Sequence, residues 1–253
     1  MPSPLHLRDR ALEVADTFFP RFADGGIDAP RGTWHPDPPH AYCPACGATH
    51  AADDTDNTDN TDPTVHPCDE CAARRSPLTR LVRLSAYQPP ADAWVKSLKW
   101  RNGWPHAAWL GRLLAEAVDA DLTGPGPLTA VVPIPMPLRR RARRGYNQAA
   151  LLARALCRHS PRHRTAGPLL RRSRYRRPQT TLSPTRRAEN ARRAFIAAPV
   201  DLSTAHVLLV DDVRTTGATL HAAARALQQR GCRHITAAVA LVADRRTAND
   251  PDA

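Results

Sequence analysis

This 253-residue sequence lacks long apolar segments. Its longest uncharged and mostly apolar run, residues 235–243, is far too short to span a bilayer. The stretch from Leu5 to Phe19 carries five charged side chains, so it has no apolar centre of the kind that a signal peptide needs. We therefore expect a cytoplasmic protein that does not insert into membranes.

Two common nucleotide-binding patterns are also lacking. The sequence contains neither a Gly-x-x-x-x-Gly-Lys-Ser/Thr loop nor a Gly-x-Gly-x-x-Gly fingerprint, which argues against a Walker A site and a Rossmann dinucleotide site. Aromatic residues make up only 5% of the chain, whereas proteins that bind single-stranded nucleic acid usually supply stacking platforms. The tryptophans at positions 94, 100, 104 and 109 have a spacing more typical of a core than of such a platform.

Lysine is nearly absent, so arginine carries most of the formal net charge of +12. Lys96 and Lys99 are the only lysines, and half of the 36 basic residues lie between Arg139 and Arg193, where Glu189 is the only acid. A positive field of this kind attracts phosphate-bearing partners, either a small polyphosphate or a nucleic acid. A solvated, arginine-rich surface that reflects coding bias explains the same composition equally well.

Four of the six cysteines form two Cys-x2-Cys pairs separated by 21 residues: Cys43 with Cys46, and Cys68 with Cys71. Four thiolates at this spacing complete the tetrahedral shell of a structural zinc site. Disulfides are the first alternative, and the lack of an export signal disfavours them. A redox dithiol is the second, although it would need only one pair. The sequence therefore predicts a small zinc module.

The rest of the chain predicts an α/β domain, a mainly parallel sheet flanked by helices. We expect strands near 84–87, 130–134, 207–210 and 235–242, and helices near 93–118, 147–158, 184–193 and 219–230, with a basic turn at 135–144. The stretch 169–183 is strand-like at first and then basic and polar. The expected organisation is an N-terminal helix and irregular linker (1–42), the zinc module with a disordered acidic insert (43–75), the α/β domain (80–245) and a disordered tail (246–253).

The most informative segment runs from Val207 to Leu220 and reads Val-Leu-Leu-Val-Asp-Asp-Val-Arg-Thr-Thr-Gly-Ala-Thr-Leu. A buried strand leads into two adjacent carboxylates, Asp211 and Asp212, and then into a small polar loop that opens a helix. Ligands of open α/β sheets bind beyond the carboxyl ends of the strands, and N–H groups at a helix start bind anions. The segment therefore predicts a phosphate cradle made by Thr215, Thr216, Gly217, Ala218 and Thr219.

This segment resembles the motif with which type I phosphoribosyltransferases bind 5-phosphoribosyl pyrophosphate (PRPP). More narrowly, the chain resembles the ComF family, phosphoribosyltransferase-like proteins linked to natural competence. Besides the cysteine pairs and the PRPP motif, the resemblance rests on Ser97-Leu-Lys-Trp-Arg101, Val132-Pro-Ile-Pro135, Arg144-Gly-Tyr-Asn-Gln148, Gln179-x2-Leu182, Arg187-x2-Asn190 and Ala194-Phe195. One departure is a spacer of some twenty residues between Phe19-Pro20 and Cys43.

The resemblance implies a type I phosphoribosyltransferase-like fold, with Asp211 and Asp212 on the ribose hydroxyls and the following loop on the 5-phosphate. Pyrophosphate would leave the sugar with magnesium bound, and Arg144, Asn147 and Gln148 are the candidates for orienting it. Gln179, Arg187 and Asn190 would belong to a hood that closes over the ligand. Asp211, Asp212 and Arg144 are the candidate catalytic residues, in electrostatic rather than proton-transferring roles.

Two functions remain open at this point. The first is a PRPP-dependent transferase that acts on an unidentified acceptor and is linked to DNA uptake or nucleotide metabolism. The second is a non-catalytic protein of natural transformation that binds single-stranded nucleic acid and senses PRPP. Single-stranded DNA and proteins of the competence machinery are the partners that the second function implies. The intact acidic pair and complete loop favour the transferase.

Overall fold

The structure is a computed structural model that describes residues 34–50, 66–73, 76–100, 104–121, 129–173 and 194–243. The expected N-terminal helix, the acidic insert, the helix at 184–193 and the tail at 246–253 lie outside these residues. Within the described part of the chain, no helix has both the length and the apolarity needed to cross a membrane.

A five-stranded sheet forms the centre of the molecule, and every neighbouring pair of its strands is parallel. The predicted α/β class with a mainly parallel sheet is therefore confirmed. In spatial order the strands are β1 (Arg80–Ala86), β7 (His234–Val242), β6 (His206–Arg214), β2 (Thr129–Pro133) and β3 (His163–Thr165). A separate two-stranded antiparallel sheet pairs β4 (Leu170–Arg172) with β5 (Phe195–Ala197).

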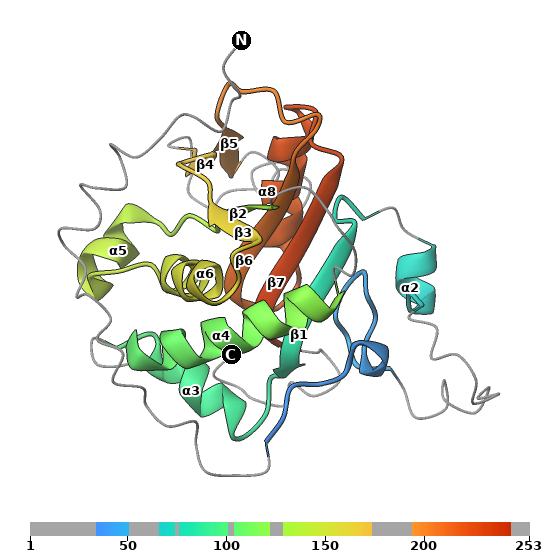
Figure 1. Cartoon of the computed structure of the whole chain (residues 1–253), viewed down its shortest axis with the longest axis vertical. Coiled ribbons are helices and arrows are strands. Elements are labelled where there is room, and N and C mark those ends of the chain that lie inside the picture. Colours follow the sequence, from blue (N-terminus) through green and yellow to red (C-terminus); the bar gives the residue numbers. More distant parts are fainter. Residues whose placement is uncertain are drawn as a thin grey trace, which may run out of the picture.

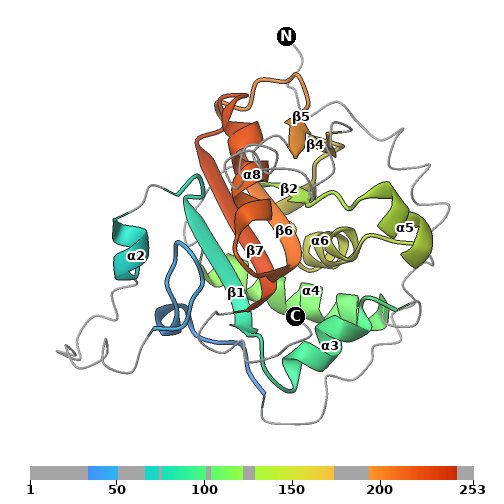
Figure 2. The same cartoon turned by 180° about the vertical axis from the view of Figure 1, so that it is seen from behind.

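Helices cover both faces of the main sheet. One face carries α3 (Ala91–Ser97), α4 (Trp104–Asp121) and α6 (Gln148–His159), and the other carries α8 (Ala218–Gln228). Figure 1 shows α4 crossing in front of β1, and Figure 2, from behind, brings α8 to the front. The strands are apolar on both faces: in β6, Val207 and Leu209 contact the α8 side while Leu208 and Val210 contact the α6 side. Such continuous apolar runs are typical of parallel strands buried between helices.

The order of the strands creates a topological switch point at the carboxyl ends of β2 and β6. The chain passes from β2 through α6 to β3 on one side of β2, and later returns to β6 on the other side. Because the connections after β2 and β6 leave in opposite directions, their loops separate at the carboxyl ends of these two strands. This is the topological switch point at which open α/β sheets bind ligands.

Several boundaries differ from those expected. The predicted 93–118 helix is divided into α3 and α4, and the break falls just before Trp104-Pro105, where the sequence indicated an interruption. The basic segment expected to be a turn contains a helix, α5 (Leu138–Arg144), which follows Pro137 and ends at Gly145 with φ of 86°. Strands β3 and β5 were not expected, because three residues each are too few to show a periodic pattern.

The segment 34–50 lies along the outer edge of β1, where it pairs with backbone groups of that edge strand (Figure 1). The N–H of Leu81 donates to the carbonyl of Pro44 at 2.7 Å, and the N–H of Asp37 donates to the carbonyl of Leu84 at 2.6 Å. An edge strand otherwise presents such groups to other chains. The segment thus joins the cysteine region to the main sheet.

The fully buried Arg83 of β1 holds this segment in place. Its guanidinium pairs with the Asp37 carboxylate at 2.8 Å and donates to Thr49 Oγ1 at 3.0 Å and to the carbonyl of Gly47. It also lies 4.8 Å from the centre of the Tyr42 ring. A buried cation needs such partners because an unpaired charge in a protein interior is costly.

We predict that Asp37→Ala lowers the free energy of unfolding by about 2 kcal/mol, because the buried Arg83 loses a hydrogen bond to a charged partner. Glu116→Ala is the matched control: it removes an exposed pair with Arg112 on α4, and such pairs contribute less than about 0.5 kcal/mol. Urea denaturation of both variants is the measurement. Equal losses in the two variants would contradict the role given to Arg83.

Candidate active site and metal centre

The acidic pair lies on β6, just beyond the point where its pairing with β2 ends. Pairing of β6 with β2 ends at Val210, whereas its pairing with β7 continues to Arg214. The strand therefore extends past the expected end at Val210, because the nine-residue β7 offers it a partner along its whole length. Asp211 and Asp212 are half-buried where β6 has separated from β2.

The two carboxylates lie close to each other, and each is attracted by an arginine from a different element. Burial raises the pKa of Asp211 well above its usual value, repulsion by Asp212 raises it further, and Arg172 of β4 opposes both. Arg144, the last residue of α5, interacts with the charge of Asp212. Partial burial lowers the pKa of the Arg144 guanidinium, which nevertheless stays protonated at any physiological pH.

The loop after β6 has the geometry of an anion cradle. Gly217 adopts a left-handed conformation, with φ of 74°, directly before α8. A Cβ at this position would lie 3.3 Å from Arg214 Nε and 3.7 Å from His221 Nε2, so both basic side chains border the loop. Thr216 Oγ1 accepts from the N–H of Ala218 at 3.4 Å. Thr215, Thr216, Ala218 and Thr219 are exposed, and an incoming ligand can reach them.

The loop after β2 forms the opposite wall. Proline occupies positions 133, 135 and 137, which fixes φ at alternate residues. The N–H of Ile134 donates to the carbonyl of Val210 at 2.9 Å, and Asn147 Nδ2 donates back to the carbonyl of Ile134 at 2.9 Å. Arg172 Nε donates to the next carbonyl, that of Pro135, at 2.9 Å. Hydrogen bonds with Val210, Asn147 and Arg172 therefore fix the loop.

The segment 144–148 connects this wall to the rest of the fold. Tyr146 is buried, and its hydroxyl donates to the carbonyls of Leu98 at 2.9 Å and of Trp100. Gln148, at the start of α6, is only 2% exposed, and within the described residues its Nε2 has no hydrogen-bond partner. Asn147 thus positions the loop, and Tyr146 fixes the segment that contains Trp100.

The structure brings most of the predicted PRPP-binding residues to the carboxyl ends of β2 and β6. Arg144 and Asn147 come from the β2 side, and the acidic pair and its loop come from the β6 side. Gln179, Arg187 and Asn190, the predicted hood residues, lie outside the described residues. Sequence reasoning missed Arg172, Arg214 and His221. Arg214 sits inside the motif itself, but only the structure shows Arg172 and His221 beside it.

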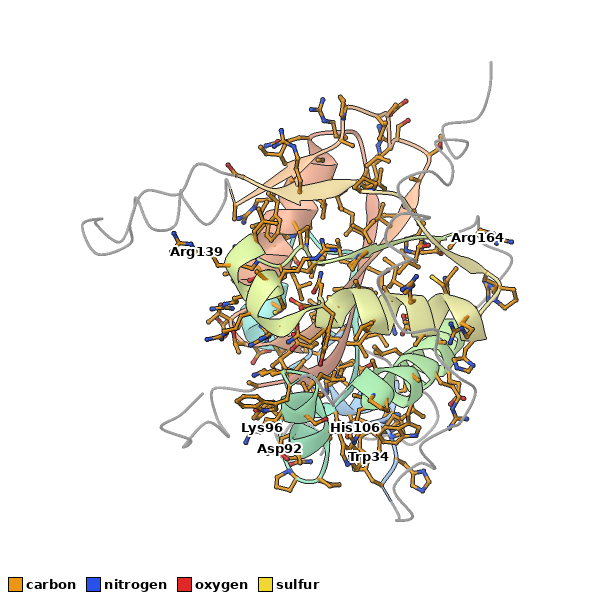
Figure 3. All side chains as sticks on the ribbon, turned by 90° about the vertical axis from the view of Figure 1, so that its left-hand side faces the viewer. Trp34, Asp92, Lys96, His106, Arg139 and Arg164 are labelled. Carbon is orange, nitrogen blue, oxygen red and sulfur yellow. The ribbon has the colours of Figure 1, made fainter. Side chains whose placement is uncertain are left out.

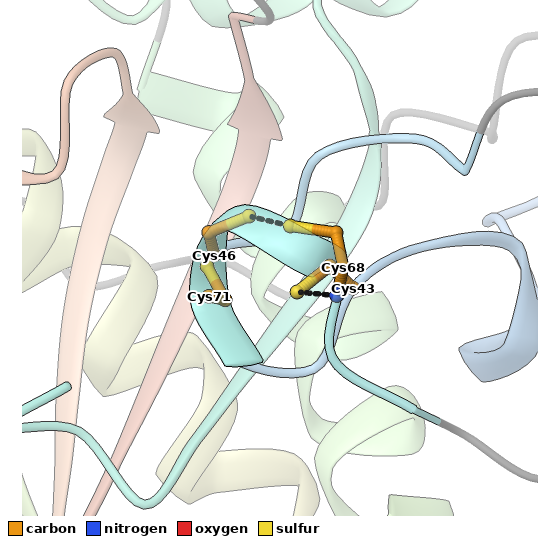
Figure 4. A group of neighbouring side chains, drawn as sticks. All are labelled: Cys43, Cys46, Cys68 and Cys71. Carbon is orange, nitrogen blue, oxygen red and sulfur yellow. Dashed lines mark hydrogen bonds between the residues drawn. The ribbon is translucent and has the colours of Figure 1, made fainter. Parts of the chain in front are cut away.

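The four cysteines form a compact cluster (Figure 4). Their sulfurs all lie within 4.8 Å of one another, and those of Cys46 and Cys68 are 3.9 Å apart. A tetrahedral zinc site with Zn–S bonds of about 2.3 Å places its sulfurs about 3.8 Å apart. The first pair lies in a tight turn in which the N–H of Gly47 donates to the carbonyl of Cys43, and the second opens the short helix α2 (Asp69–Ala72).

The sulfurs of the cluster also interact with one another and with the backbone. A hydrogen bond from Cys46 lowers the pKa of the Cys43 thiol to about 4. The same contact raises the pKa of Cys46, and burial raises it further. The N–H of Cys68 donates to Cys43 Sγ at 3.3 Å, as is common for metal-bound thiolates. The four thiols can therefore hold a metal ion such as zinc.

Comparison with known proteins gives consistent matches. The phosphoribosyl transferase domain family matches residues 142–253. The DNA utilization protein YhgH of Escherichia coli K12 is 34% identical over 196 residues, which cover 75% of this chain and 78% of that protein. Competence protein F of Haemophilus influenzae is 32% identical over 66% of this chain and 75% of its own length. Competence protein ComFC of Bacillus subtilis is 38% identical over 40% of this chain and 39% of its own length.

We predict that the purified protein carries about one metal ion per chain, held by four sulfurs. Elemental analysis of protein prepared without chelators measures it. Cys43→Ser should lose the metal, whereas Cys157→Ser, which changes a thiol outside the cluster, should keep it. Metal-free wild-type protein, or full metal content in Cys43→Ser, would contradict this assignment.

Proposed function

The chain belongs to the ComF/YhgH family of phosphoribosyltransferase-domain proteins, and on this premise we propose that it binds PRPP between the carboxyl ends of β2 and β6 and transfers the phosphoribosyl group to an acceptor. The observation that carries the proposal is the acidic pair next to the Thr215–Thr219 loop at the switch point. The names of two relatives, a DNA utilization protein and a competence protein, support a link between this activity and the use of DNA or competence.

Each part of the site matches one part of PRPP. Carboxylates accept hydrogen bonds from hydroxyl groups, so Asp211 and Asp212 suit the two ribose hydroxyls. The loop ahead of α8, with Arg214 and His221 beside Gly217, suits the 5-phosphate because the N-terminus of α8 adds its positive dipole end. Arg144 and the wall after β2 would then face the pyrophosphate at C1 of the sugar.

The reaction breaks the bond between C1 and the pyrophosphate oxygen while the acceptor nucleophile forms its bond to C1. Pyrophosphate leaves with the electron pair, and negative charge grows on its oxygens. The cation of Arg144 stabilises this charge in the transition state more than in the ground state, which is the condition for catalysis. Bound magnesium would neutralise further charge on the leaving group. The acidic pair would orient the ribose through its hydroxyls.

The metal centre has a different role in this proposal. We assign zinc to the four cysteines, because a complete set of four thiolates leaves no open position for a substrate. The cluster lies at the β1 edge, and β7 and β6 separate it from the loop of the candidate PRPP site. Zinc would therefore stabilise the segment that covers β1 and take no part in the transfer.

We predict that the double variant Asp211→Asn with Asp212→Asn abolishes magnesium-dependent PRPP binding, since it keeps the shape of both side chains but removes two charges. Isothermal titration calorimetry is the measurement. Glu116→Gln removes an exposed carboxylate from α4 and should bind PRPP like wild type. PRPP affinity at the wild-type level in the double variant would overturn the assignment of this site.

The empty double variant should also unfold at a slightly higher temperature than wild type at neutral pH. The folded-state pKa of Asp211 is raised above its unfolded value, so its ionised form destabilises the fold at pH values above that pKa. As pH falls through the raised pKa, the native protein takes up a proton and this cost disappears. The gain of the variant over wild type should therefore shrink as the pH approaches the ordinary carboxyl range.

A second candidate function, binding of single-stranded nucleic acid, is favoured by one exposed surface. Trp100 is 74% exposed, in contrast to the core role expected for it, whereas Trp94 and Trp109 pack with Trp34. Tyr146 ties the backbone of Trp100 to the segment that directly follows the arginine-rich α5. Figure 3 shows Arg139 on the outer side of this helix. A stacking ring beside a cationic helix is a common arrangement in single-strand binders.

If this surface binds DNA, Trp100→Ala should weaken the binding of a single-stranded oligonucleotide about 10-fold, since stacking contributes ~1–3 kcal/mol per base. Arg140→Gln with Arg143→Gln should weaken it and flatten its dependence on salt. The control is Arg230→Gln with Arg233→Gln, two exposed arginines at the amino end of β7. Fluorescence anisotropy at several salt concentrations is the measurement. Equal effects of both arginine pairs would mean that the protein attracts DNA only non-specifically, which would contradict a binding surface at α5.

A further inference from the structure

The wall after β2 depends on a residue that comes from far along the chain. The carbonyls of Ile134 and Pro135 both accept side-chain hydrogen bonds, the first from Asn147 and the second from Arg172. Asn147 directly precedes α6, whereas Arg172 lies at the end of β4, 37 residues after Pro135. Arg172 therefore connects the small antiparallel sheet to the wall of the site.

The side chain of Arg172 is held in a fixed orientation. Its guanidinium lies 5.1 Å from the centre of the Phe195 ring, and Phe195 is its pairing partner in β5. Phe195 is itself 5% exposed and belongs to the core under α8. A planar guanidinium stacked on an anchored ring loses little further freedom when its Nε–H makes a directed hydrogen bond. Arg172 thus forms a rigid connection between β5, β4 and Pro135.

The charge of the same side chain also acts on Asp211. Its positive charge lowers the pKa of Asp211, against the raising effects of burial and of Asp212. Arg144 acts on Asp212 from the opposite wall. One arginine thus contacts the loop proposed to face the pyrophosphate and acts on a carboxylate proposed to hold the ribose.

We propose that Arg172 is a positioning residue that fixes the Ile134–Pro137 loop for the pyrophosphate of PRPP and supplies positive charge to the acidic pair that would hold the ribose. The proposal rests on the function proposed above. It divides the role of Arg172 into two parts: a directed hydrogen bond that only the guanidinium Nε–H supplies, and a positive charge that lysine also supplies. The two parts act on different portions of the same ligand, so they are separable by experiment.

The test compares Arg172→Lys and Arg172→Gln in the full-length protein, with PRPP and ribose 5-phosphate as ligands in the presence of magnesium. Ribose 5-phosphate has the sugar and the 5-phosphate but lacks the pyrophosphate. Calorimetry gives both affinities, and thermal unfolding confirms that each variant is folded. Arg171→Gln is the matched control, because Arg171 is the exposed neighbour on β4 and carries the same charge.

Arg172→Lys should weaken PRPP about 10-fold, the effect of losing one hydrogen bond from a charged donor, and leave ribose 5-phosphate within about 2-fold of wild type. Arg172→Gln should weaken both ligands. It should also move the loss of ribose 5-phosphate binding on acidification to higher pH, since the positive charge that lowers the pKa of Asp211 is then lost. Arg171→Gln should match wild type in all of these measurements.

The possible failures are distinguishable. If wild type binds neither ligand, the proposed function falls and the role of Arg172 falls with it. If wild type binds PRPP and Arg172→Lys binds it equally well, only the role of Arg172 in positioning the loop is wrong. Equal losses of both ligands in Arg172→Lys would mean that the residue acts on general stability, which also overturns the proposal.

Discussion

Two carboxylates that are adjacent in the sequence and close in space repel each other, and the charges of nearby arginines compensate for this repulsion. Asp211 and Asp212 lie at the point where β6 separates from β2, so both stay near the surface while the strand behind them is fully buried. Arg144 acts on one carboxylate and Arg172 on the other. These arginines come from the seven-residue helix α5, which has no buried residue, and from the three-residue strand β4, which has one. Their placement is best explained by the charge that they balance.

The order of the strands explains why the arginines reach this place. Because β2 leads to β3 on one side and β6 lies on its other side, the loop after β2 opens directly beside the acidic pair. Prolines 133, 135 and 137 have no N–H groups and restrict the backbone of that loop. The carbonyls of Ile134 and Pro135 accept hydrogen bonds from Asn147 and Arg172. A loop fixed in this way does not change its conformation when a ligand binds, so it has to have the binding conformation beforehand. Such preorganisation is the main source of electrostatic catalysis.

Local patterns made part of this site predictable from the sequence. Four apolar residues followed by two acids and Thr-Thr-Gly indicate a strand, its end and a loop, and the Cys-x2-Cys pairs indicate their own cluster. Arg172 could not be found in this way, because its partner is a backbone carbonyl 37 positions earlier. The helix α5 was taken for a turn because its five arginines show no apolar period. Trp100 was expected in the core, although its neighbours Trp94 and Trp109 do pack as expected.

The metal centre depends on the sheet in a manner that no local pattern reveals. The turn after Cys46 fits closely against β1, since a Cβ on Gly47 would lie 2.5 Å from Leu81 and 2.9 Å from Val242. The buried Arg83 binds the carbonyl of the same glycine. Val242 is also the β7 partner of Arg214, the residue that borders the loop of the candidate PRPP site. One contact with Val242 of β7 and one strand pairing therefore lead from the cysteines to that loop, so the metal centre can support the site mechanically without being part of its chemistry.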